Sequence, residues 1–227
     1  MVQEDINKVL LEEAEKGNKV VRLKGGDPFL FGRGGEELEL LSENGIPYEI
    51  VPGVTSPISV PAYNGIPVTH RDFCSSLHII TGHKRAGQEY DIDFKALTRT
   101  KGTLVFLMGI AALEDICKGL LAGGMDPNVP AAVLQKGTTA GQKRVVATVG
   151  TLKEEVDRQG IETPAIIVVG KVCSLADKFA WYEKLPLAGW KVLVTRPRQH
   201  ISKTADLLRQ KGAEVLELPS ICTVPVE

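Results

Sequence analysis

The sequence predicts an α/β protein of two lobes, followed by the opening of a third α/β segment. Two observations lead to this fold class. Short apolar runs rich in β-branched residues alternate along the chain with amphipathic stretches of helical period, which is typical of layered strands and helices. Residues 163–170 form a nearly continuous apolar run, as expected of a strand that is covered on both faces.

The first lobe is predicted over residues 1–82. A helix is expected at residues 6–16, because Ile6, Leu10 and Ala14 share one face and Gly17 then ends the helix. Further helices are expected over 36–44 and 56–64, and strands over 20–23, 48–51 and 77–81.

The second lobe is predicted over residues 83–185 and opens with a hinge loop at 83–93 that is rich in glycine, lysine and aspartate. The same alternation of patterns follows. Strands are expected over 103–108, 131–135, 144–148 and 165–169, with helices over 113–122 and 152–159. A third segment, 190–227, is predicted to contain strands over 191–197 and 212–219 around a helix at 201–211.

Composition agrees with an ordinary soluble enzyme. The 227 residues are 43% hydrophobic and 24% charged, with a formal net charge of -1, which favours neither nucleic acid nor a membrane surface as partner. No apolar run approaches the roughly 20 residues of a spanning helix. The four cysteines are scattered without a Cys-x-x-Cys pair, so free thiols and no metal site are expected.

The most informative stretch is residues 24–37, which follow the first apolar run. Gly25 and Gly26 lack Cβ atoms and allow a ligand to approach the backbone closely, while Asp27 supplies an acceptor. The phosphate-loop and dinucleotide fingerprints are both absent, and Asp27 would repel a pyrophosphate. A neutral or cationic ligand such as S-adenosylmethionine fits better. The alternative is a glycine-rich turn that binds nothing.

The chain resembles the tetrapyrrole methylases, and within them the uroporphyrinogen-III C-methyltransferase branch. The resemblance rests on ordered motifs over about 185 residues rather than on one loop. These motifs are Gly-Gly-Asp-Pro at 25–28, Pro-Gly-Val-Thr-Ser at 52–56, Gly-Ile-Pro-Val-Thr-His-Arg at 65–71, Thr-Gly-His at 81–83, the strand at 103–109 and Gln-Lys-Gly-Thr at 135–138.

The resemblance implies S-adenosylmethionine as the cofactor and S-adenosylhomocysteine as its product, held between the two lobes. The cofactor-binding residues that it implies are Gly25, Gly26, Asp27, Leu30, Thr55, Ser56, Met108 and Gly137. For Met108, composition alone leaves core packing as an alternative, because buried methionines commonly fill gaps.

The substrate implied by the resemblance is uroporphyrinogen III, whose carboxylates require cations in the site. The candidate substrate-binding residues are Arg33, His70, Arg71, Lys136 and Arg144. Solvation of a surface remains the alternative for Lys136 and Arg144, and a buried capping role remains the alternative for His70.

Both ends of the chain are expected to be incomplete. Family members place an Asp and a Lys, which are proposed to handle protons, ahead of residue 6, and no residue here matches them. The catalytic residues are therefore unknown, and a missing first strand would expose the sheet near residues 20–23. Val-Thr-Arg-Pro at 194–197 resembles the start of a uroporphyrinogen-III synthase, which predicts a fusion; a short extension of this chain's own is the alternative.

The resemblance therefore implies a cytoplasmic methyltransferase that makes precorrin-2 for siroheme or cobalamin synthesis, and from the family alone a homodimer is expected. Three alternatives remain open at this point. They are another precorrin methyltransferase of the same fold, a fragment that binds without catalysis, and a glycine-rich α/β domain with no small-molecule site.

Overall fold

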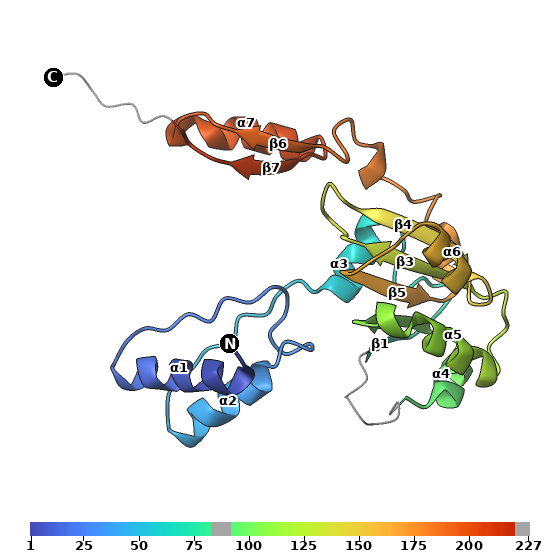
Figure 1. Cartoon of the computed structure of the whole chain (residues 1–227), viewed down its shortest axis with the longest axis horizontal. Helices are drawn as coiled ribbons and strands as arrows, with labels where there is room; N and C mark the ends of the chain where they lie inside the picture. The colour runs from blue at the N-terminus through green and yellow to red at the C-terminus, as the bar shows by residue number, and fades with distance from the viewer. Residues whose placement is uncertain (83–91, 221–227) are drawn as a thin grey trace. The chain divides into compact units, whose positions relative to one another are not determined.

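The computed structural model describes residues 1–82 and 92–220. The predicted hinge at 83–93 lies largely outside the described residues. By internal contacts the chain divides into two compact units, Met1–Ile58 and Ser59–Glu227 (Figure 1).

The first unit is built on two helices that pack against each other, α1 (Gln3–Glu15) and α2 (Gly34–Glu43). Both begin with carboxylates in the first turn, where the helix dipole favours negative charge. Leu10 of α1 and Glu37 of α2 are buried. Both predicted helices are thus present, and each begins two or three residues earlier than the sequence pattern indicated.

The strands predicted at 20–23 and 48–51 are not formed, which corrects the sequence analysis. Among the described residues, 19–26 and 47–52 make no backbone–backbone hydrogen bonds. A strand requires a hydrogen-bonded neighbour, and β-branched composition alone does not supply one. The apolar side chains of Val21, Leu23 and Val51 are consequently 78%, 85% and 74% exposed.

A hollow of about 930 Å³ lies in this unit, beside the two extended segments. Its other lining comes from the apolar faces of the helices, with Leu10 and Ala14 from α1 and Leu38 and Leu41 from α2. The helices therefore present an apolar surface that no strand of this unit covers.

The second unit contains a five-stranded mixed sheet in the order β1-β2-β5-β3-β4. β1 and β2 are parallel, β5 is antiparallel to both β2 and β3, and β4 at the edge is antiparallel to β3. Figure 1 labels β1, β3, β4 and β5 of this sheet. The strands are β1 (Leu77–Thr81), β2 (Thr103–Leu107), β3 (Pro130–Gln135), β4 (Lys143–Thr148) and β5 (Ala165–Val169).

Both faces of this sheet are covered. Along β2, Leu104 and Phe106 face one hydrophobic cluster and Val105 and Leu107 face the other, as the period of two in a strand requires. The first cluster includes residues of α5 (Leu113–Ala122) and α6 (Leu152–Arg158), with Phe94 and Leu97 of α4 (Phe94–Thr100) packed against it. The apolar run of β5 is buried on both sides, as its sequence predicted.

Helix α4 was not predicted from the sequence. Its signal is Asp93, whose side chain accepts a hydrogen bond from the Ala96 N–H at 2.8 Å and so caps the helix. The other side of the sheet is covered mainly by irregular structure. It includes residues of α3 (Ser56–Tyr63) and of the 3₁₀ turn η2 (Lys171–Leu175). Two further 3₁₀ turns are η1 (Ile110–Ala112), which precedes α5, and η3 (Tyr182–Lys184).

The chain continues into a parallel βαβ segment, residues 190–217, whose elements agree with the sequence prediction. β6 (Lys191–Val194) pairs with β7 (Glu214–Glu217), and α7 (Arg198–Gln210) connects them. Val194, Ala205 and Ala213 are buried, whereas Leu193 and Leu216, which are paired across the two strands, are 53% and 66% exposed.

The exposed apolar segments of the first unit yield a prediction. Replacing Leu23 and Val51 together by lysine should reduce self-association, because charges on unpaired extended segments oppose edge-to-edge pairing. Light scattering across a concentration series should show less aggregate, and the melting temperature should change little. The matched control is Val133→Lys, a buried position that should abolish cooperative unfolding. Unchanged aggregation of the double variant would contradict the interpretation.

Candidate functional site

In the first unit, the glycine loop is fixed by close contact between two backbone segments. Gly26 has φ +88°, and a Cβ atom at Gly53 would lie only 2.6 Å from the Gly26 carbonyl oxygen. Side chains at these positions would therefore strain the backbone or force the segments apart. The loop that carries Gly25 and Gly26 is thus held beside the loop that leads to Thr55.

The Asp27 carboxylate joins these two loops. Its Oδ1 accepts a hydrogen bond from the Phe29 N–H at 2.9 Å, and its Oδ2 accepts one from the Gly53 N–H at 3.1 Å. Each carboxylate oxygen has further acceptor capacity. The residue predicted to contact the cofactor therefore also has a structural role that its sequence context did not indicate.

The turn after Asp27 is equally constrained. The Gly34 N–H donates to the Pro28 carbonyl at 3.0 Å, and a Cβ at Gly34 would come within 2.6 Å of that same oxygen. Leu30 is half-buried in this turn. Arg33 is exposed, and its backbone takes the left-handed conformation with φ 58°. Its guanidinium nitrogens Nε and Nη2 donate to the Glu36 carboxylate at 2.9 and 2.5 Å, and this interaction raises the pKa of Arg33.

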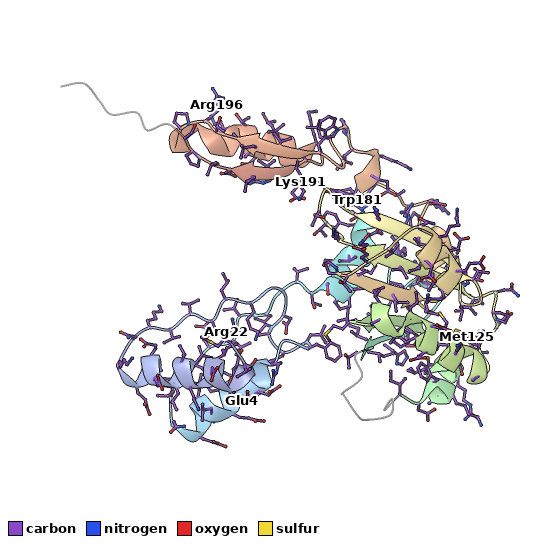
Figure 2. All side chains as sticks on the ribbon, in the orientation of Figure 1. Glu4, Arg22, Met125, Trp181, Lys191 and Arg196 are labelled. Atoms are coloured by element: carbon purple, nitrogen blue, oxygen red, sulfur yellow. The ribbon has the colours of Figure 1, made fainter. Side chains whose placement is uncertain are left out.

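A buried carboxylate, Glu37, anchors the residues that lead into the glycine loop. Its Oε1 accepts hydrogen bonds from Lys24 Nζ at 3.0 Å, Gln3 Nε2 at 3.1 Å and Arg22 Nε at 3.2 Å. Figure 2 labels Arg22. Burial alone would raise the pKa of Glu37, but the hydrogen bonds from Lys24, Gln3 and Arg22 and the charge of Lys24 together outweigh that effect and lower the pKa. Sequence analysis missed this network; the acidic first turn of α2 was its only signal.

In the second unit, the sheet brings two of the predicted site residues to one edge. Phe106 of β2 and Val133 of β3 both stand opposite Ile167 of β5, so β2 and β3 run in the same direction on either side of β5. Met108 follows β2 and Lys136 follows β3, and both therefore lie at the edge where β5 begins.

Met108 is not a core residue. It is 55% exposed and takes the left-handed conformation, with φ 54°, directly after a fully buried strand. The gap-filling alternative is thus contradicted, because a side chain that fills a cavity would be buried. An exposed methionine at the carboxyl end of a strand is placed where a ligand can reach it.

The neighbouring loop, residues 136–142, has a strained backbone. Lys136 and Thr138 have φ 45° and 70°, although neither is glycine. Gly137, between them, packs so closely against Val60 of α3 that a Cβ would overlap the valine side chain. Internal bonds hold the loop: the Thr138 N–H donates to Gln142 Oε1 at 2.8 Å. Strain of this kind is common at ligand-binding loops.

The other cationic candidates differ in their surroundings. Arg71 and Lys136 are exposed, and His70 is partly buried, with its ring edge-on to Phe73 at 5.0 Å between centroids. His70 Nδ1 accepts a hydrogen bond from the Asp72 N–H at 3.2 Å. Arg144 is engaged by the protein itself, since its guanidinium lies 2.8 Å from the carboxylates of Asp177 and Glu183 and from the Asn64 carbonyl. A role for Arg144 in substrate binding stays a prediction.

No group of three or more His, Cys, Asp or Glu side chains that could hold a metal ion occurs in the described parts of the chain. Within the same ranges, none of the helices is long and apolar enough to cross a membrane. Cys74, Cys117 and Cys173 are free thiols, and burial raises the pKa of Cys117 to about 11, so this thiol is unreactive at neutral pH.

Comparison with known proteins defines the class. The family model for the tetrapyrrole (corrin/porphyrin) methylases matches residues 1–153, and the chain belongs to this family. Within it, the chain is 51% identical over 183 residues to a uroporphyrinogen-III C-methyltransferase of Bacillus subtilis, covering 81% of this chain and 71% of that protein.

A longer match and a solved structure add detail. The chain is 56% identical over 224 residues to the porphyrin biosynthesis protein HemD of Ruminiclostridium josui, covering 99% of this chain but 44% of that protein. The chain thus spans less than half the length of that relative. The crystal structure of the Thermus thermophilus uroporphyrin-III C-methyltransferase with S-adenosylhomocysteine aligns with a TM-score of 0.66 at 37% identity, over 76% of this chain and 74% of that chain.

The Glu37 network yields a prediction about pH. The pKa of Glu37 is lowered in the folded state from its ordinary value of 4.5. Such a carboxylate stabilises the fold at pH values above the pKa of the unfolded state, and this stabilisation is lost as the pH falls through the pKa of the folded state. Glu37→Gln should therefore destabilise the protein at pH 7, by about 1–3 kcal/mol because buried donors lose their anion. It should also flatten the loss of stability below pH 4.5.

The measurement is urea unfolding of both proteins from pH 3.5 to 7. Glu36→Gln is the matched control, since Glu36 is the neighbouring carboxylate on α2 but is half exposed. Equal effects of the two substitutions would show that burial of Glu37 has no special role.

Proposed function

We propose that this chain carries the methyltransferase part of an S-adenosylmethionine-dependent uroporphyrinogen-III C-methyltransferase. The observation that carries the proposal is the combination of family membership with two rigid glycine loops, at 25–27 and 136–138. The Thermus thermophilus relative was solved with S-adenosylhomocysteine, which supports this cofactor class. The product proposed is precorrin-2, on a route to siroheme or cobalamin.

The loops fit such a cofactor. In the first unit, Gly25 and Gly26 keep the loop free of side chains, while Asp27 retains acceptor capacity for an amino or hydroxyl group. We assign Leu30, Thr55 and Ser56 to the same ligand. In the second unit, Met108 and the backbone at Gly137 are proposed contacts.

The chemistry proposed for this chain is mainly one of positioning. When bound, S-adenosylmethionine would supply an activated methyl group to an electron-rich pyrrole carbon. The protein's contribution is to hold the methyl group, the sulfonium and the acceptor carbon in line, and well-oriented systems gain roughly 7–11 kcal/mol in this way. The backbone strain at Lys136 and Thr138 belongs to a loop that hydrogen bonds to Gln142 and Glu214 restrain, and such restraint reduces the ordering that binding would require.

Cationic side chains would orient the substrate carboxylates. Arg33, Arg71 and Lys136 are exposed and are the first candidates, with His70 beside them. Arg144 could bind a substrate carboxylate only if that carboxylate displaced Asp177 or Glu183 from the Arg144 guanidinium. We propose no proton-transfer residue among the described residues.

We further propose that residues 190–227 open a uroporphyrinogen-III synthase-like domain and that the enzyme is a cytoplasmic homodimer. The match over 224 residues to the Ruminiclostridium josui protein supports the first part, because an alignment of that length includes the βαβ segment. The homodimer and the cytoplasmic location rest on the family resemblance and composition.

Asp27 gives the test of the cofactor proposal. Asp27→Ala should weaken S-adenosylhomocysteine at least tenfold, about 1.4 kcal/mol, because it removes an acceptor and releases the Gly53 loop. Titration calorimetry measures the affinity. The control is Asp72→Ala, at a carboxylate that is 78% exposed in the second unit. Unchanged affinity of the Asp27 variant would remove this residue from the site.

The activity itself is tested by anaerobic incubation of the protein with uroporphyrinogen III and S-adenosylmethionine. A product whose mass increases by two methyl groups, with the absorbance of a precorrin, is expected. Turnover of a later precorrin in place of uroporphyrinogen III would favour another methylase of the same fold. Binding without turnover of either compound would favour a binding-only role for this chain.

A further inference from the structure

The loop at 136–142 is connected to the βαβ segment by a direct hydrogen bond. The Ala140 N–H donates to Glu214 Oε2 at 2.8 Å, and the two residues are 74 positions apart in the chain. Lys191 Nζ lies 3.2 Å from Glu214 Oε1 and balances its charge. The hydrogen bond from Ala140, and then that from Lys191, lower the pKa of Glu214, so this group is an anion at neutral pH.

A second set of contacts links the same two parts of the molecule. The Tyr182 hydroxyl donates to the Gly212 carbonyl at 3.3 Å, just before β7. The Tyr182 ring packs edge-on against Tyr63 at 4.9 Å between centroids. The Tyr63 carbonyl accepts a hydrogen bond from Gln142 Nε2 at 3.2 Å, and Gln142 in turn holds the Thr138 N–H.

The position of Glu214 is set by backbone contacts. The Leu187 N–H donates to the Lys211 carbonyl at 2.8 Å, and the Glu214 N–H donates to the Trp190 carbonyl at 2.9 Å. Gly212 has φ +95°, and a Cβ there would lie 2.8 Å from Leu185 Cβ. The start of β7 is therefore seated closely on residues 185–190, and Glu214 cannot shift without moving this turn. Figure 2 labels Lys191 of β6 and Trp181, which precedes the turn.

From these contacts we propose that Glu214 is a positioning residue for the strained loop at 136–142, so that the βαβ segment supports the loop on which ligand binding depends. The inference rests on the proposed function, because it takes Gly137 as a cofactor contact. Two non-glycine residues with positive φ persist only where the surroundings hold them, and Glu214 supplies the restraint on the carboxyl half of this loop.

The experiment compares three substitutions in the full chain. Glu214→Ala removes the acceptor, Glu214→Gln keeps an oxygen that can accept from Ala140, and Glu217→Ala is the matched control. Glu217 lies on the same strand and pairs with Arg209, and it has no contact with the loop among the described residues. The main measurements are the amide exchange rate of Ala140 without ligand and the affinity for S-adenosylhomocysteine; the melting temperature and the turnover kinetics are measured beside them.

We expect Glu214→Ala to speed exchange at Ala140 at least tenfold and to weaken S-adenosylhomocysteine about fivefold, with an unchanged melting temperature. Glu214→Gln should stay within about twofold of the wild type on both measures, and Glu217→Ala should change neither. In turnover, KM for S-adenosylmethionine should rise in the Glu214→Ala variant while kcat at saturation stays the same.

Two failures are distinguishable. If the wild type binds S-adenosylhomocysteine and Glu214→Ala binds it equally well, the positioning role is wrong and the proposed function stands. If the wild type does not bind it, the proposed function and the ligand part of this inference both fall. If the amide of Ala140 exchanges at the same rate in Glu214→Ala as in the wild type, the hydrogen bond between Ala140 and Glu214 does not restrain the loop and the proposal is overturned.

Discussion

The close approach of two backbone segments at Gly26 and Gly53 is the constraint on which the first unit's part of the candidate site depends. A side chain at Gly53 would overlap the Gly26 carbonyl, and a side chain at Gly26 would strain a backbone whose φ is +88°. Asp27 then links the two segments through Oδ2, which accepts from the Gly53 N–H, while its Oδ1 accepts from the Phe29 N–H within its own loop. Because the charge that would face a ligand also holds the loops together, ligand affinity and local order at this site cannot be varied independently.

In the second unit the five-stranded sheet fixes the positions of the candidate residues. β2 and β3 run in the same direction on either side of β5, so the residues that follow them, Met108 and Lys136, leave the sheet at one edge. The strands are fully buried and interlocked with clusters on both faces, which gives these two positions a rigid base. α3 adds a second restraint through the contact between Val60 and Gly137.

Sequence reasoning succeeded where the physical signal is local. The helices of the first unit and all strands of the second followed from periodicity, and the family from ordered motifs. The strands at 20–23 and 48–51 were wrong because a strand depends on a neighbour that sequence pattern does not reveal. The Glu37 network and the Ala140–Glu214 bond were missed because their members are distant in sequence. For Met108, composition could not decide between core and site; its exposure excludes the core.

Backbone strain is concentrated in the loops proposed to form the site. Six non-glycine residues in the described ranges have positive φ, and five of them belong to the candidate loops: Phe31, Arg33, Met108, Lys136 and Thr138. Such conformations cost about 1–3 kcal/mol each in general, so a sequence retains them where their surroundings enforce them. Here the enforcing contacts are glycine packing, the Asp27 bonds and the Gln142 bonds. The strain therefore falls on the loops that the motifs identified.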